Sequence, residues 1–127
     1  MTATTVLITG AGGFLGSLLA DTLVKLQPQH TFSFILIDVR TPPAPKSLGI
    51  KSVCLAADLT TPTGVDSIFR TPLGLPSVIY SLHGIMSKGA EEDWELGFRV
   101  NFESTRSLLD KARELVPGVT FVFASSV

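Results

Sequence analysis

Short apolar runs recur along the chain, each bounded by glycine, proline or aspartate. They cover residues 6–9, 32–38, 53–58, 77–82 and 119–124. Continuous apolar runs rich in Val, Ile, Leu and Phe are typical of strands buried on both faces of a parallel sheet. The pattern therefore predicts five such strands.

Amphipathic segments separate several of these runs. After the first strand, five leucines recur at helical spacing until Pro28, which predicts a helix against one face of the sheet: Leu15, Leu18, Leu19, Leu23 and Leu26. A short helix is predicted at residues 64–70. The longest is predicted at residues 91–116, where Trp94, Phe98 and Phe102 follow a four-residue spacing that we interpret as core.

Strands that alternate with helices imply right-handed crossovers and a parallel sheet with helices on both faces. We expect an α/β, Rossmann-type doubly wound sheet of about five strands in the order 3-2-1-4-5. Residues 1–127 are expected to form a single domain. In such a sheet, a ligand binds at the carboxyl ends of the first and fourth strands, where the strand order reverses.

Composition narrows the classes of partner. Ten basic and eleven acidic residues without long runs of one sign predict no nucleic-acid or membrane-surface binding, and no segment has the pattern of a signal peptide or a membrane span. A single cysteine, Cys54, cannot form an internal disulfide, and we interpret it as a buried structural thiol in a cytoplasmic protein. The acidic cluster at residues 91–93 fits a helix start better than a metal site, so we expect no metal.

The turn after the first strand reads TGAGGFLG. A P-loop would need Lys and Ser/Thr after its second glycine, and G-x-G-x-x-G would need glycine at Leu15, so both patterns fail. Gly10, Gly13 and Gly16 instead give G-x-x-G-x-x-G, which suits a tight turn, close approach of a pyrophosphate and helix packing. The pyrophosphate would lie at the helix start, beside Phe14 and Leu15. A plain tight turn is the alternative.

Two aspartates follow strands at places that suit a dinucleotide. Asp38 lies 22 positions after Gly16, where a carboxylate can accept hydrogen bonds from the adenosine ribose. Its charge would repel a 2′-phosphate, which favours NAD over NADP, although Arg40 could pair with that phosphate. Asp58 and Leu59 could lie along the adenine, or Asp58 could form a helix cap or turn.

With these motifs in order, the chain resembles the extended short-chain dehydrogenases, the NAD-dependent epimerase and dehydratase family. Residues 81–101, SLHGIMSKGAEEDWELGFRVN, and the later STRSLLDKARE and FVFASSV resemble the D-erythronate dehydrogenase group of that family. The resemblance implies oxidation of a hydroxyl of a small sugar acid by hydride transfer to NAD. A nucleotide-sugar epimerase or dehydratase, or a non-catalytic NAD-binding regulatory module, stays open as an alternative.

The resemblance also implies roles for individual residues. The three glycines would hold the pyrophosphate and Asp38 the ribose. Leu82 and Gly84 would line the passage toward the nicotinamide, and Ser87 would lie near the cofactor or substrate. Asn101 would support the active-site hydrogen-bond network, and Ser126, the catalytic serine, would orient the substrate oxygen.

The chain departs from the family pattern in two places. The family's strand-four histidine is displaced to His83, which we therefore interpret as a packed or hydrogen-bonded residue rather than a base. The family's Tyr-x-x-x-Lys pair has no match, because the single tyrosine, Tyr80, is followed four positions later by Gly84. We expect this chain to end before that catalytic helix and the substrate domain, to be inactive alone, and to self-associate through an exposed fifth strand.

Overall fold

The computed structural model describes residues 3–125, apart from the side chain of Ser87. Five parallel strands form one sheet in the order β3-β2-β1-β4-β5, which confirms the predicted fold class and strand order. The strands are β1 (Ala3–Thr9), β2 (Thr31–Asp38), β3 (Lys51–Ala56), β4 (Val78–Ser81) and β5 (Thr120–Phe123). The helical elements are α1 (Phe14–Leu26), α2 (Pro62–Ser67), α3 (Ser87–Glu92), α4 (Trp94–Phe98), the π-helical turn η1 (Arg99–Glu103) and α5 (Ser104–Leu115).

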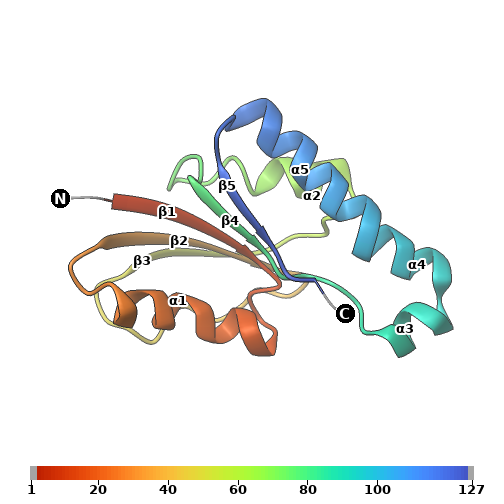
Figure 1. Ribbon diagram of the computed structural model, residues 1–127, viewed down its shortest axis with the longest axis horizontal. Helices are drawn as coiled ribbons and strands as arrows, with labels where there is room; N and C mark the ends of the chain where they lie inside the picture. The colour runs from red at the N-terminus through yellow and green to blue at the C-terminus, as the bar shows by residue number, and fades with distance from the viewer. Residues whose placement is uncertain (1–2, 126–127) are drawn as a thin grey trace.

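Helices cover both faces of the sheet (Figure 1). On one face, Ala20 of α1 packs with the β1 and β2 side chains Val6, Ile8 and Phe34. On the other face, alternate side chains of β1, β2 and β4 form a second cluster with residues of α2, of the position after it and of α5: Leu7, Ile35, Ile37, Val65, Ile68, Ile79, Leu108 and Ala112. Because alternate residues of a strand point to opposite faces, the continuous apolar runs fill both layers.

The side of α1 that packs against the sheet is only in part the leucine-rich side that the sequence predicts. Gly16 and Ala20 are the buried residues of α1, whereas Leu15, Leu18 and Leu26 are exposed. The small residues let the helix axis come close to the strands, so the leucines on either side of them are turned outward. Only Leu19 and Leu23 of the predicted five pack against the core.

The long helix predicted at residues 91–116 is broken. Asp93 adopts a non-helical conformation, and its carboxylate accepts a hydrogen bond from the Leu96 N–H at 3.1 Å, which caps α4. This capping role agrees with the interpretation of the acidic cluster as a helix start. A wider π-helical turn, η1, then joins α4 to α5 and shifts the helix faces relative to a regular helix.

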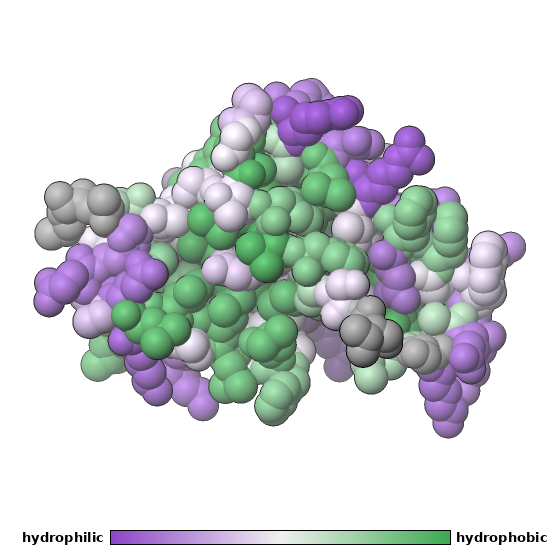
Figure 2. Space-filling view, viewed as in Figure 1, coloured by the Kyte–Doolittle hydropathy of each residue, from purple (hydrophilic) through white to green (hydrophobic). Residues whose placement is uncertain are grey.

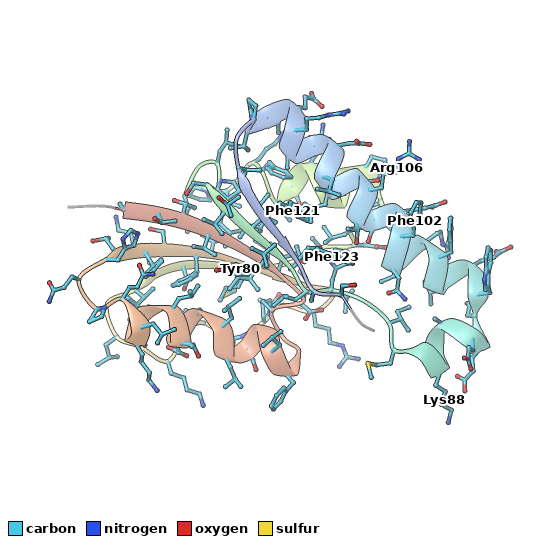
Figure 3. The ribbon with its side chains drawn as sticks, viewed as in Figure 1. Tyr80, Lys88, Phe102, Arg106, Phe121 and Phe123 are labelled. Carbon is cyan, nitrogen blue, oxygen red and sulfur yellow. The ribbon has the colours of Figure 1, made fainter. Side chains whose placement is uncertain are left out.

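The interpretation of the three aromatic residues as core is wrong. Trp94, Phe98 and Phe102 are 70%, 40% and 53% exposed, and they stack on one another with ring centroids 5.4 and 5.1 Å apart. The opposite side of the helix is buried through Gly97 and Leu108. Figure 3 shows Phe102 and Arg106 projecting from the outer side, away from the sheet.

Candidate functional site

The glycine turn between β1 and α1 leaves no room for side chains at two positions. Gly10 has φ +67°, and a Cβ there would lie 2.8 Å from the backbone of Leu82 and His83. A Cβ on Gly16 would lie 2.8 Å from the Cα of Ala11 and even closer to the Gly10 carbonyl. Gly10 is therefore required by the turn and its contact with β4, and Gly16 by helix packing.

Gly13 differs from these two glycines because its surroundings are more open. It is the N-cap of α1, and no side chain caps the helix there. The first N–H groups of a helix have no partner within the helix, and they carry the positive end of its dipole. This helix start, with Phe14 and Leu15 as its first residues, is suited to an anion.

Asp38 is held beside the glycine turn by backbone N–H groups. Its Oδ2 accepts a hydrogen bond from the Gly12 N–H at 2.8 Å, and its Oδ1 accepts one from the Val39 N–H at 2.7 Å. A Cβ on Gly12 would come within 3.0 Å of Oδ2. The carboxylate at the end of β2 is thus fixed next to the uncapped start of α1. The spacing of the glycines did not predict this hydrogen bond between Gly12 and Asp38. Arg40, two residues on, is exposed.

Asp58 lies in the loop after β3, two residues beyond the strand end at Ala56. Its Oδ1 accepts hydrogen bonds from the Thr60 N–H at 3.0 Å and the Thr60 hydroxyl at 2.6 Å. These bonds, aided by the charge of Arg99, lower the pKa of Asp58 below 3.8. These contacts form a turn, the alternative role predicted for Asp58.

These groups surround one cavity of about 610 Å³ at the carboxyl ends of the strands. Of the predicted residues, it is lined by Gly10, Gly13, Asp38, Asp58, Leu59, Leu82 and Gly84. Phe14, Leu15, Gly16 and Asn101 are not among its lining residues. Ile85, Leu96, Val100 and Ser104 also line it. They lie in the stretches that carry the family resemblance, but no individual role at the site was predicted for them. The cavity lies at the reversal of strand order, where the topology predicts a ligand.

His83 lines the cavity and is hydrogen-bonded to residues of β1 and α5. Its Nδ1 lies 2.7 Å from Thr9 Oγ1, and its Nε2 lies 2.7 Å from Ser104 Oγ. Burial lowers the pKa of His83 below 6.5, and the negative charge of Asp38 opposes this shift. These contacts match the interpretation of His83 as a hydrogen-bonded residue.

Asn101, in η1, clamps the loop that follows β4. Its Oδ1 accepts a hydrogen bond from the Ile85 N–H at 2.7 Å, and its Nδ2 donates one to the Ile85 carbonyl at 3.0 Å. Both bonds lie at the surface. The side chain thereby ties residue 85, a cavity-lining position, to the helix.

We expect Asn101→Ala to lower the free energy of unfolding by about 1 kcal/mol, because two exposed hydrogen bonds are lost. Asn101→Asp keeps the acceptor for the Ile85 N–H and should lose about half as much. Urea unfolding followed by circular dichroism measures both. Equal stability of Asn101→Ala and the wild type would show that the clamp does not hold the loop.

Two predicted site residues lie outside the described part of the chain: Ser126 and the side chain of Ser87. Within residues 3–125, no group of three or more His, Cys, Asp or Glu side chains could hold a metal ion. Cys54 is partly buried in β3, and burial raises the pKa of its thiol. None of the helices in this part of the chain has the length and apolar character needed to cross a membrane.

The fold and the glycine turn define a Rossmann-type domain of the kind that binds dinucleotides. A family model described as the NAD dependent epimerase/dehydratase family matches residues 6–127. The chain belongs to this family, which confirms the resemblance seen in the sequence.

Two D-erythronate dehydrogenases are similar to the chain. The protein from Haemophilus influenzae is 39% identical over 122 residues, and that from Cupriavidus necator is 34% identical over 129 residues. Each match covers 96% of this chain and 38% of the relative. The chain therefore spans well under half the length of these curated relatives.

Solved structures agree with the fold. A nucleoside-diphosphate-sugar epimerase from Agrobacterium tumefaciens is 32% identical, with a TM-score of 0.85, covering 100% of this chain and 38% of that one. UDP-glucose 4-epimerase from Thermus thermophilus, solved with NAD, is 30% identical, with a TM-score of 0.74, covering 96% and 37%.

Proposed function

We propose that this chain binds NAD in the cavity at the carboxyl ends of its strands. The observation that carries this is the position of Asp38, whose carboxylate is hydrogen-bonded to Gly12 beside the uncapped start of α1. A pyrophosphate at the helix N-terminus would place an adenosine ribose near that carboxylate. The negative charge favours the free 2′-hydroxyl of NAD over the 2′-phosphate of NADP.

The remaining lining residues suit the other parts of the dinucleotide. Leu59 and the turn around Asp58 would contact the adenine, and Leu82 and Gly84 would lie along the path to the nicotinamide. Bound NAD supplies the hydride acceptor, and the chain's own residues bind and orient it. Within this proposal residues 1–127 form one NAD-binding domain, and its proposed location is the cytoplasm.

The proposed activity of the whole enzyme is oxidation of a hydroxyl of a small sugar acid. The support is the similarity to two D-erythronate dehydrogenases, each matched over 96% of this chain. Asn101 and Ser126 would serve the active-site network and the substrate oxygen. The single tyrosine, Tyr80, lies in β4 and is followed four positions later by Gly84, so this chain has no Tyr-x-x-x-Lys pair. We expect the chain alone to bind NAD without turnover.

A fluorescence titration with NADH, followed by an assay of D-erythronate oxidation, tests this function. Saturable binding without turnover is the expected result, and the absence of binding would overturn the proposal. Turnover of a nucleotide sugar in place of D-erythronate would favour the alternative function, an epimerase or dehydratase. The structural similarity to a nucleoside-diphosphate-sugar epimerase, with a TM-score of 0.85, supports this alternative.

We also propose that the chain self-associates through β5. This strand lies at one edge of the sheet, and Val122 and Phe123 are 39% and 50% exposed. Figure 2 shows apolar side chains gathered over the middle of the molecule, between α1 and α5. Exposed apolar edge strands promote pairing between chains.

Light scattering at micromolar concentration should show species larger than a monomer. Phe123→Lys, which places a charge on the exposed edge, should shift them toward the monomer. A monodisperse wild-type monomer would contradict the proposal.

A further inference from the structure

His83 links the end of β1 to the start of α5 through its two ring nitrogens. Thr9 lies at the end of β1, His83 in the segment after β4, and Ser104 at the start of α5. The two nitrogen–oxygen distances are both 2.7 Å. His83 and Ser104 themselves line the cavity, as do Leu82, Gly84 and Ile85 around the histidine.

The neighbouring bonds indicate which ring nitrogen carries the proton. The Leu82 N–H donates to Thr9 Oγ1 at 3.1 Å, and the Ser104 hydroxyl donates to the Val100 carbonyl at 2.5 Å. The Thr9 hydroxyl is then free to donate to Nδ1, and the Nε2–H donates to Ser104. A neutral imidazole with its proton on Nε2 satisfies every group in this chain of bonds.

A proton added to Nδ1 would disturb this arrangement. Thr9 Oγ1 would have to accept from both Leu82 and His83 and turn its own proton to the Tyr80 carbonyl, which is 3.5 Å away. That distance is long for a hydrogen bond between two oxygens. Protonation therefore leaves the Thr9 hydroxyl proton without a well-placed acceptor and rearranges the hydrogen bonds that join His83 to the end of β1.

The burial of the ring and the negative charge of Asp38 shift the pKa of His83 in opposite directions. Asp38, at the end of β2, favours the protonated ring, but burial outweighs it. Asp58, after β3, lines the same cavity, and its charge is partly balanced by Arg99 of η1. Thr9 and Ser104 contribute no charge from β1 and α5. The neutral ring is thus the form that the fold favours.

The segment held by His83 also contacts the glycine turn. The backbone of Leu82 and His83 lies so close to Gly10 that a Cβ there would approach to 2.8 Å. Two residues later, Asn101 fixes Ile85 by both of its backbone groups. A shift of residues 82–85 would therefore move both the cavity wall and the turn at Gly10.

We propose that His83 is a positioning residue: as a neutral imidazole it fixes residues 82–85 against the dinucleotide cavity, and its protonation weakens NAD binding. The second clause rests on the proposed function. The direction of the pH effect follows because the neutral form of His83 is the one that supports binding. NAD affinity is full while the ring is neutral, and it falls as the pH drops through the pKa of His83, which burial lowers below 6.5.

A pH titration of the wild-type chain from 8 to 5 tests this by two readouts. Long-range ¹H–¹⁵N spectra of the imidazoles report the tautomer and titration of His83, and amide spectra report Leu82 and Ile85. We expect the Nε2–H tautomer, and amide shifts that follow the ring titration. An Nδ1–H tautomer, or amides that do not respond to the ring, would overturn the positioning role.

The same samples, titrated with NAD, give the dissociation constant at each pH. We expect it to rise about fivefold as His83 is protonated, an effect equal to one hydrogen bond. A constant value across the His83 titration would overturn the proposal. So would tighter binding at low pH, because an imidazolium acting mainly by attraction to the pyrophosphate would give that result.

His83→Gln and His30→Gln form a matched pair, since the chain has two histidines. His30 lies just before β2, where it is hydrogen-bonded to Thr4. His83→Gln should bind NAD about fivefold more weakly at pH 8 and lose the dependence on pH, while His30→Gln keeps the wild-type profile. A retained pH profile in His83→Gln would overturn the proposal. If the wild type binds no NAD at any pH, the proposed function fails, and the amide spectra still decide the positioning role.

Discussion

Gly16→Ala should lower the free energy of unfolding by about 3 kcal/mol, the upper part of the range for inserting a methyl group into a packed site. The new Cβ would meet the Gly10 carbonyl and the Cα of Ala11, both backbone atoms that no side-chain rotation can move. Relief requires α1 to move away from β1. Urea unfolding followed by circular dichroism measures the loss, and NAD titration should show that the displaced turn binds poorly.

Gly13→Ala is the matched control in the same turn. Gly13 has φ −76°, which alanine adopts without strain, and its Cβ would lie 3.3 Å from the Gly10 carbonyl. We expect a loss of stability of less than about 1 kcal/mol. NAD affinity should nevertheless fall, because the methyl group occupies the helix start proposed for the pyrophosphate. Equal destabilisation by the two alanines would contradict the separate roles given to these glycines.

Asp38→Ala should weaken NAD binding by about tenfold or more, the effect of losing a hydrogen bond to a charged group. Binding of NADP should weaken much less, since the repulsion of its 2′-phosphate is lost together with the carboxylate. The preference for NAD over NADP should therefore shrink or reverse. Parallel calorimetric titrations with the two dinucleotides measure this ratio.

Arg40→Ala separates the contribution of the neighbouring charge. Arg40 lies two residues after Asp38 and is exposed, so its removal should leave NAD affinity unchanged. NADP affinity should fall, because the guanidinium offsets part of the repulsion between Asp38 and the 2′-phosphate.

Unchanged affinity of Asp38→Ala for both dinucleotides would contradict the role assigned to that carboxylate.

Local patterns predicted much of this molecule. The apolar runs predicted the five strands, because residues buried on both faces need no polar alternation. Glycine spacing predicted the turn, and the packing at Gly10 and Gly16 now gives the steric reason. Asp38 was predicted at the site from its place after the second strand, and it lines the cavity.

Features that depend on distant contacts could not be predicted in this way. A four-residue spacing is the same on the buried and the exposed side of a helix, so Trp94, Phe98 and Phe102 were assigned to the wrong side. The bond between Gly12 and Asp38 spans 26 positions, and the bond between Thr9 and His83 spans 74. Hydrogen bonds between residues so far apart in the sequence depend on how the strands pair in the folded sheet, so local patterns do not predict them.

Amide chemical-shift mapping with NAD tests the central claim most directly, because it reports both whether the dinucleotide binds and where. We predict saturable shifts at Gly12, Gly13, Phe14 and Val39, with weaker responses to NADP at the same concentration. Those amides lie around the uncapped start of α1 and the anchored Asp38 carboxylate. Shifts confined to other parts of the chain, or no shifts at saturating NAD, would contradict the account.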